Sequence, residues 1–390
     1  MKKVIFGTAL ASMALLSACS SDNELANVET AANNAIGFHV VGNKAETRAN
    51  IIGADNITST DFNVFAFTRN DDGTDGNIFM GEKANILGQK GIKIDYTKNY
   101  WDYANAADIH YWPENTALNF YAVSPGSFED MEMAGVYGWD INNNIKTISY
   151  SPFDEYAGRT EKKNLDVMYA ITPKQTQKTN GGKVHFQFKH ILSQVAFKAK
   201  TQLENMEVEI NAIKIHNPWI KGTYTLPTTS SENGTWALTE PTIGDKRGAF
   251  TVVTGKNIKV TSSGADISVA TPMLFVPQSL VAWKTNATTA KPKADADKSG
   301  ETYLEITCKI KQAGVYVFGS ESTYKTLYVP FGPTWEIGKR HIYTLIFGGG
   351  YDEYGNQILK PINFEAETTD WVDDINNKNN GNDININIDK

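Results

Sequence analysis

Residues 184–198, VHFQFKHILSQVAFK, decide the fold class of this chain. Apolar side chains occupy every second position over Val184, Phe186 and Phe188, and the same period returns from Val195 onward. A period of two places alternate side chains on opposite faces, which is the pattern of a β-strand with one buried face. The stretch therefore predicts two successive strands.

The same two-residue period extends over most of the chain. It recurs in short segments separated by Gly, Asn, Asp and Pro, which favour turns, and no long amphipathic helix pattern interrupts it. We therefore predict an all-β protein made of two antiparallel β-sandwich domains in tandem, each sheet having one buried face. The alternating segments include residues 62–66, 92–96, 118–122, 208–215, 327–331 and 342–346.

A polar stretch near the middle of the chain predicts the boundary between the two domains. Residues 174–183 read KQTQKTNGGK, a composition typical of linkers. We expect an N-terminal sandwich over residues 49–175 and a C-terminal sandwich over residues 183–374.

The first residues predict export. Lys2 and Lys3 precede an apolar run over residues 4–16, which is too short to span a bilayer and is typical of a secretory signal. The sequence LSAC that ends at Cys19 resembles the lipobox of bacterial lipoproteins. We expect residues 1–18 to be a lipoprotein signal peptide and Cys19 to carry the lipid that anchors the chain to the outer membrane. An ordinary signal peptide with an incidental cysteine is the alternative.

Composition and motifs disfavour several function classes. The net charge is -7, with 37 Lys and Arg against 44 Asp and Glu, whereas a nucleic-acid partner requires a basic face. The phosphate-binding loop, the His-Glu-x-x-His zinc motif and the Gly-x-Ser-x-Gly nucleophile motif do not occur. We therefore predict no catalytic activity, no cofactor and no nucleic-acid partner.

The second cysteine of the chain, Cys308, lies in an alternating segment. Residues 303–310 read YLEITCKI, so the thiol falls in the apolar row. We predict a small core residue on a strand. A catalytic nucleophile is the alternative, but no nearby His and Asn or Asp pattern supports it.

Two candidate metal sites have simpler explanations. Residues 71–82, DDGTDGNIFMGE, have the spacing of a calcium loop, but Gly73 removes the ligand at the third position. A polar hairpin loop explains the segment as well. His185 and His190 are close in sequence, yet a separation of five on a strand points them to opposite faces. We therefore predict no metal site and expect structural histidines.

Aromatic residues are frequent enough to suggest a sugar-binding surface. Exposed rings can stack on sugars, but aromatic side chains are equally at home in sandwich cores. We favour the core for the two clusters in which they are densest: Tyr100, Trp101 and Tyr103, and Tyr111 and Trp112.

Several phrases of the sequence, taken together, resemble the fimbrillin superfamily, whose members build the type V pili of gut and oral Gram-negative anaerobes. The resemblance implies transthyretin-like sandwiches, a cell-surface pilus location, assembly with other pilus subunits, and adhesion to host or bacterial surfaces. The phrases occur in the family's order: YWP at 111–113, LNFYAVSP at 118–125, LDVMYA at 165–170, VHFQFKHILSQVAFK at 184–198, INF at 362–364 and DW at 370–371.

The resemblance also implies a mechanism of assembly. In this family an Arg-specific protease removes a short N-terminal strand, and an extended segment of another subunit fills the exposed groove. Arg48 and Ala49 flank the candidate cleavage site, which makes residues 19–48 a tether and propeptide. The removable strand would present three apolar side chains on one face: Ile36, Phe38 and Val40.

The C-terminus supplies a candidate donor strand. Residues 375–390 begin with an Asn-rich lead and end in alternating residues, with Ile384, Ile386 and Ile388 on one face. An added strand gains affinity from backbone hydrogen bonds and specificity from alternate side chains. A disordered terminus, or an edge strand folded back on its own domain, is the alternative.

The predicted function is therefore a structural subunit of a pilus. The rival from another class is a surface glycan-binding lipoprotein of a polysaccharide-uptake system. It would share the lipobox, the sandwiches and the aromatic residues, and it would keep residues 20–48 as a tether. The position of the subunit in the pilus (shaft, tip or anchor) is left open.

Replacing the predicted lipidation site tests the export prediction. Cys19→Ser should abolish labelling of the protein by radioactive palmitate and leave unprocessed precursor, because the thiol is the acylation nucleophile. Unchanged labelling in this variant would make Cys19 an incidental cysteine.

Overall fold

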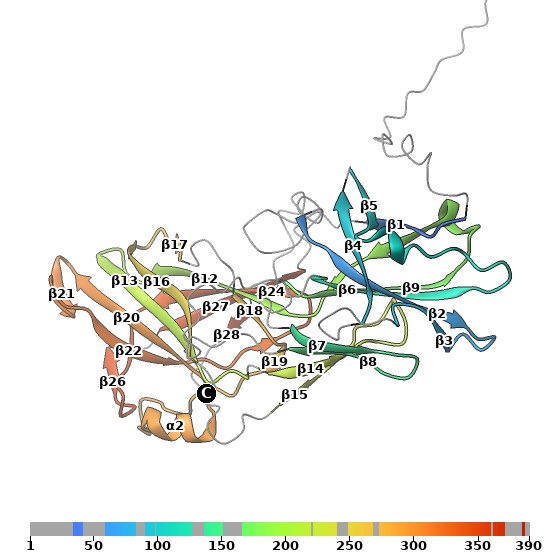
Figure 1. Ribbon diagram of the computed structural model, residues 1–390. Helices are drawn as coiled ribbons and strands as arrows, with labels where there is room; N and C mark the ends of the chain where they lie inside the picture. The colour runs from blue at the N-terminus through green and yellow to red at the C-terminus, as the bar shows by residue number, and fades with distance from the viewer. Residues whose placement is uncertain are drawn as a thin grey trace, which may run out of the picture. The chain divides into compact units, whose positions relative to one another are not determined.

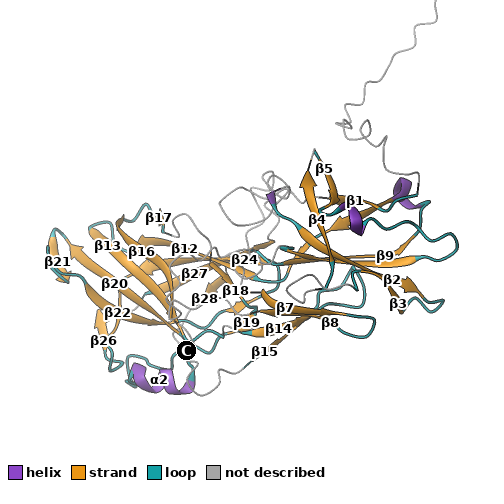
Figure 2. Cartoon of the chain, viewed as in Figure 1, coloured by secondary structure: helices purple, strands orange, loops and turns teal. Residues whose placement is uncertain are grey.

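The computed structural model describes residues 34–41, 59–82, 90–97, 99–126, 136–150, 166–219, 221–239, 249–267, 273–359, 362–370 and 384–386. Strands make up nearly all of the regular structure in these ranges, and the one α-helix found in them is α2 (Lys293–Ser299) (Figure 2). The prediction of an all-β protein is confirmed. No helix in the described part of the chain is long and apolar enough to cross a membrane.

The first sandwich is built around a seven-stranded sheet. Its strand order is β11-β9-β6-β2-β4-β5, and β3 pairs with β2 as well (Figure 1). The strands are β2 (Phe62–Arg69), β3 (Asp75–Met80), β4 (Ile92–Thr97), β5 (Tyr100–Tyr103), β6 (Leu118–Ser124), β9 (Met168–Gln175) and β11 (Lys189–His190).

Both faces of this central sheet are covered, so its middle strands are buried on both sides. Val64 and Phe120 belong to one core, and Phe65 and Tyr121 belong to the other. The expectation of one buried face per sheet is therefore wrong here, because residues 62–67, FNVFAF, carry apolar side chains in both alternate rows. One cover is a two-stranded sheet of β1 (Gly37–Val41) and β10 (Lys183–Gln187); the other has four strands, β7 (Val136–Ile141), β8 (Lys146–Tyr150), β14 (Gly222–Thr225) and β15 (Thr235–Leu238).

The second sandwich consists of a six-stranded sheet and a seven-stranded sheet, which enclose one core. One contains β12 (Ser193–Thr201), β17 (Ala265–Asp266), β18 (Met273–Phe275), β24 (Lys339–Phe347), β27 (Asn363–Asp370) and β28 (Ile384–Ile386). The other contains β13 (Met206–His216), β16 (Ala249–Val260), β20 (Tyr303–Gln312), β21 (Val315–Phe318), β22 (Lys325–Pro330), β25 (Gly349–Tyr351) and β26 (Gln357–Leu359). A separate pair is formed by β19 (Gln278–Ser279) and β23 (Thr334–Trp335).

Cys308 lies in the core of the second sandwich. Its side chain is fully buried on β20, beside Ile306 and Ile310 in the same apolar row. Burial raises the pKa of the thiol, because the thiolate is poorly solvated there. The prediction of a core residue is confirmed.

Most strand pairs are antiparallel, as predicted, and two of those described are parallel. One parallel pair joins β12 to β24, and the other joins β1 to β10. Parallel neighbours cannot be joined by a tight hairpin. The strand β1 is thus held beside β10 by pairing and packing rather than by a short connection.

The strand pairing around the predicted linker, residues 174–183, does not divide the chain where the domain boundary was predicted. The polar segment forms a tight 3-10 turn, Thr179–Gly182, in which Asn180 and Gly181 take left-handed conformations. The turn leads directly into β10, which covers the first sandwich, and the second sandwich begins only with β12. In addition, β14 pairs with β8, so residues 222–225 belong to the first sandwich although they follow β12 and β13 in the chain. Gly and Asn therefore mark a turn here rather than a linker.

A buried histidine makes the stability of the second sandwich depend on pH. His341 on β24 is 3% exposed, and its Nε2 accepts a hydrogen bond of 3.0 Å from the backbone N–H of Glu336. Burial, with a smaller contribution from the charge of Lys339, lowers the pKa of His341 to about 4. The unfolded chain, with an ordinary pKa of about 6.5, binds this proton more readily than the folded protein does. Stability is therefore complete above pH 6.5 and decreases as the pH falls toward 4.

We expect the free energy of unfolding to fall by roughly 2–3 kcal/mol more in the wild type than in His341→Gln between pH 7 and pH 4. Chemical denaturation at several pH values measures the difference. Parallel pH profiles for the two proteins would show that His341 is not the group responsible.

Candidate functional site

The candidate site is the groove that β1 fills on the first sandwich. The strand lies parallel to β10, with Phe38 beside Val184 and Val40 beside Phe186. Three apolar side chains, here called the apolar row, enter the core from β1 and the residue before it. Their exposed fractions are 1% for Ile36, 5% for Phe38 and 7% for Val40. The alternation in the sequence thus corresponds to burial of one face.

Aromatic rings form the deepest part of the groove. Phe38 meets Tyr103 of β5 edge to face, with ring centroids 5.3 Å apart, and stacks on Phe186 of β10 at 6.1 Å. Phe186 in turn packs on Phe62 of the central sheet at 5.7 Å. Burying a side chain of this size stabilises a fold by about 1.5–3 kcal/mol, so the apolar row contributes roughly 5–9 kcal/mol as an upper estimate.

Backbone contacts hold the residues just before β1. The N–H of Ile36 donates to the carbonyl of His110 at 2.9 Å, and the N–H of Trp112 donates to the carbonyl of Asn34 at 2.9 Å. The Asn34 side chain also donates from Nδ2 to the carbonyl of Trp112, at 3.2 Å. The groove is therefore bounded by β10 along its length, by β5 beside it, and by residues 110–112 at its start (Figure 1).

The opposite face of the same strand pair is polar. Gly37 lies beside Lys183, and His39 lies beside His185 with ring centroids 4.9 Å apart. Partial burial lowers the pKa of His185, and the neighbouring His39 and Lys183 add to this effect. Acidification therefore brings like charges together across the strand pair.

An open hollow of about 220 Å³ adjoins the outer face of β10. It is lined by the edge of β9, by Ser230, and by the side chains of His185, Gln187 and Lys189. No carboxylate lines it.

The remaining predicted site residues are only partly described. Cys19, Arg48, Ala49 and Ile388 lie outside the described residues. Ile384 and Ile386 lie in β28, whose backbone pairs antiparallel with β27 at the edge of the second sandwich, with Ile386 beside Phe364. The structure therefore places residues 384–386 on the sheet of their own domain and does not bring them to the groove.

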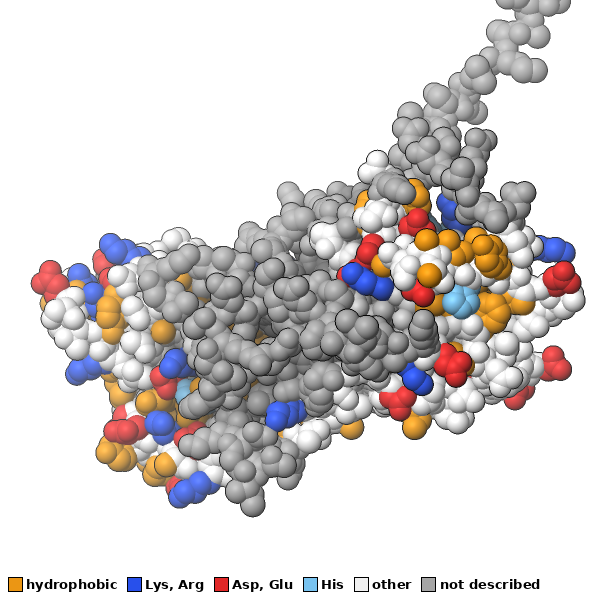
Figure 3. Space-filling view, viewed as in Figure 1, with side chains coloured by type: hydrophobic (Ala, Val, Ile, Leu, Met, Phe, Trp, Pro, Cys, Tyr) orange, Lys and Arg blue, Asp and Glu red, His pale blue; other side chains and the backbone are white. Residues whose placement is uncertain are grey.

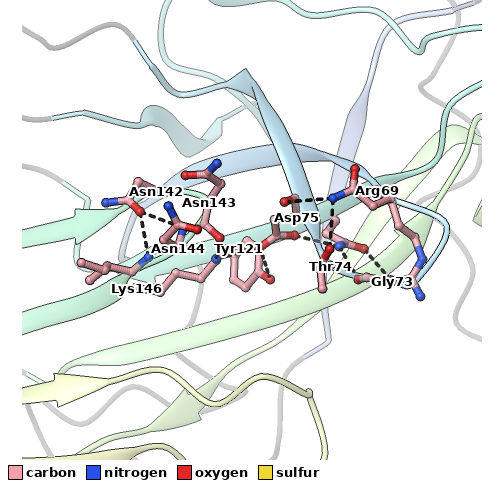
Figure 4. A network of polar contacts seen from close by, with 12 residues as sticks. Arg69, Gly73, Thr74, Asp75, Tyr121, Asn142, Asn143, Asn144 and Lys146 are labelled. Atoms are coloured by element: carbon pink, nitrogen blue, oxygen red, sulfur yellow. Dashed lines mark hydrogen bonds and ion pairs between the residues drawn. The ribbon is translucent and has the colours of Figure 1, made fainter.

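The segment with calcium-loop spacing is a salt-bridged hairpin connection (Figure 4). Asp75 is paired with Lys146 of β8 at 2.7 Å and accepts hydrogen bonds from the Tyr121 hydroxyl at 2.8 Å and from Asn119 Nδ2 at 2.7 Å. Asp72 accepts hydrogen bonds from the N–H and the hydroxyl of Thr74. No group of three or more candidate metal ligands occurs in the described ranges.

Lys146 links the central sheet to its four-stranded cover. Besides its ion pair with Asp75, its Nζ lies 4.7 Å from the ring centroid of Tyr121 and 5.1 Å from that of Phe67. Sequence reasoning missed this contact, because nothing in the chain pairs residues 75 and 146 before the fold brings them together.

The histidines and the clustered aromatic residues mainly contact other side chains of the fold. The Nδ1 of His190 lies 2.6 Å from a carboxylate oxygen of the buried Asp166. Trp101 and Trp112 are core residues, as predicted, whereas Tyr100 is 39% exposed and Tyr111 is 51% exposed. Apolar side chains thus reach the surface of the first sandwich, where Figure 3 shows a group of them around a histidine on its right-hand side.

Comparison with known proteins identifies the family. A family model described as fimbrillin-like matches residues 47–371. The chain belongs to the fimbrillin-like family. The similarity read from the sequence phrases is confirmed by this match, which covers most of the chain.

The solved structure of one fimbrial protein has a similar fold, and that of a second matches at a lower score. A fimbrial protein from Bacteroides vulgatus is similar with a TM-score of 0.59 at 17% identity, over 87% of this chain and 99% of that one. A fimbrial assembly protein from Parabacteroides distasonis matches with a TM-score of 0.31 at 13% identity, over 80% of this chain and 92% of that one. No curated protein matches the sequence.

Two substitutions in β1 test how the groove is filled. Phe38→Ala should lower the free energy of unfolding of the first sandwich by roughly 3–5 kcal/mol, because it leaves a cavity between Tyr103 and Phe186. His39→Ala on the outer face should change it by less than about 0.5 kcal/mol. Chemical denaturation followed by the fluorescence of the buried tryptophans measures both. Equal effects of the two substitutions would contradict the described facing of β1.

Proposed function

We propose that this fimbrillin-like protein is a pilus subunit that polymerises by exchange of the strand in this groove. Membership of the fimbrillin-like family supports a pilus subunit and a structural rather than a catalytic role. The observation that carries the exchange mechanism is the burial of Ile36, Phe38 and Val40 in a core otherwise built from residues 62–188. A strand from another subunit with the same alternation could replace them.

Proteolysis would release the groove. The only covalent link between β1 and the rest of the sandwich is the segment between Val41 and Ser59, and it contains Arg48. A cut after Arg48 by an Arg-specific protease turns β1 from a tethered strand into a separate peptide. Its docking then loses the high effective concentration that a short tether provides. The lipid at Cys19 would remain with β1, and the body of the subunit would be free to leave it.

The tail of another subunit is the proposed replacement. In the isolated chain, β28 pairs with β27 over three residues, so few hydrogen bonds have to break for the tail to leave. Residues 371–383 lie between the two strands. These 13 residues could span roughly 45 Å when extended, which is enough to reach a neighbouring molecule.

Deleting residues 384–390 should leave a folded monomer that forms no filaments after cleavage at Arg48. Changing Ile384, Ile386 and Ile388 together to Asn should have the same effect, since each loses about 1.5–3 kcal/mol of burial. Changing Asn385 and Asn387 to Ser is the matched control and should be nearly neutral, because those side chains would remain outside the core.

Size-exclusion chromatography and electron microscopy of the cleaved proteins measure the outcome. Filaments of normal length from the truncated protein would exclude the tail as donor. Absence of filaments from the cleaved wild-type protein would favour the rival function, a glycan-binding surface lipoprotein.

A further inference from the structure

We propose that the tail enters the groove parallel to β10, with Ile384, Ile386 and Ile388 in the positions of Ile36, Phe38 and Val40, and that it fits the polar rim of the groove better than β1 does. This inference rests on the proposed function and specifies the orientation, the register and the electrostatic preference of the exchange. Two independent observations carry it.

The first observation is the asparagine at the start of the groove. Asn34 stands two residues before Ile36, and it satisfies both the carbonyl and the N–H of Trp112. When β1 leaves, these backbone groups lose their partners, and unpaired backbone groups near a core are costly. The backbone carbonyl of an incoming strand can restore the bond from the Trp112 N–H, and an asparagine side chain at the same offset also restores the bond to the Trp112 carbonyl.

The tail has that asparagine in one orientation. Residues 34–40 read NAIGFHV, and residues 382–388 read NDININI, so Asn382 precedes Ile384 as Asn34 precedes Ile36. The aligned strand runs in the same direction as β1, which is parallel to β10. The reversed alignment places Lys390 at this offset instead, and the ammonium group on its long, flexible side chain is a less well positioned donor than the short asparagine amide.

The second observation is the charge along the outer face of the groove. Lys183, His185, Gln187 and Lys189 form one outward row, here called the basic row, along β10 and β11. Neither Lys183 nor Lys189 pairs with a carboxylate among the described residues. Partial burial lowers the pKa of Lys189, as it does that of His185, so both charged forms are incompletely solvated.

The residues at positions 35, 37, 39 and 41 supply no negative charge to balance the positive charge of the basic row. Ala35, Gly37 and Val41 carry no charge, and His39 places a second imidazole against His185. In the proposed register the tail presents Asp383, Asn385, Asn387 and Asp389 at these four positions. Two carboxylates and two neutral amides therefore replace one imidazole and three apolar or small residues.

The tail also fits the space beside the basic row. Asn385 takes the position of Gly37, where an added Cβ would come within 3.3 Å of Cγ of Lys183. That atom belongs to a flexible, half-buried side chain, which can move by a few tenths of an ångström. Asn387 takes the position of His39 and removes the contact between two histidines.

Engineered disulfides test orientation and register in the full chain. Cys19→Ser removes the lipidated thiol, and the buried Cys308 stays in place. The proposed register pairs position 387 with position 185, so His185→Cys with Asn387→Cys should give a ladder of covalent oligomers in oxidised filaments. His185→Cys with Asn385→Cys should give none, even where electron microscopy shows filaments.

The outcomes separate this inference from the proposed function. A ladder from the Asn385 pair alone would show a reversed or shifted strand and would overturn the register. Filaments without a ladder from either pair would show that the tail does not lie beside β10. Absence of filaments from the unsubstituted cleaved protein would instead contradict the proposed function.

The electrostatic preference has its own test in the full chain. Asp383→Asn with Asp389→Asn should slow filament growth after cleavage by roughly two- to thirtyfold in 20 mM salt, and the difference should vanish in 0.5 M salt. Asp373→Asn with Asp374→Asn, directly before the tail, is the matched control and should grow at the normal rate. Light scattering measures the rates. Equal rates for both double variants in low salt would overturn the role of the basic row.

Discussion

One of the two hydrophobic cores of the first sandwich is complete only when β1, a strand from the beginning of the chain, covers it. The central sheet of the first sandwich is apolar on both faces, so each face needs a cover. On one face the cover is only two strands wide, and one of them, β1, comes from the beginning of the chain. Phe38 of β1 packs between Tyr103 and Phe186 in that core. A single segment joins β1 to the rest of the sandwich.

This constraint connects stability to assembly. While β1 is in place, its backbone pairs with β10. The residues just before it are hydrogen-bonded to residues 110–112. Once it is removed, the same body has an open apolar groove and unpaired backbone groups, which favour association with an extended strand. The proposed exchange would keep the contacts of the core nearly constant, so small differences at the polar rim could decide which strand is retained. The basic row beside β10 supplies such a difference.

The sequence predicted the parts of this arrangement that depend on local alternation. Ile36, Phe38 and Val40 were identified because a two-residue period is visible within five residues, and the position of Cys308 followed from the same period. The features it could not predict depend on contacts between distant residues. The double burial of β2, the pairing of β14 with β8, and the ion pair of Lys146 with Asp75 all require the folded topology. The turn at Thr179–Gly182 was interpreted as a linker because Gly and Asn favour both structures.

Amide hydrogen exchange of Lys183–Gln187 tests the central claim most directly, because these residues form the wall of the groove. Their amides should be protected in the uncut protein, exchange rapidly in the cleaved subunit once β1 has dissociated, and be protected again in filaments. Uniform protection of β10 in all three states would contradict the account. It would mean that the groove stays closed without β1 and that no strand has to replace it.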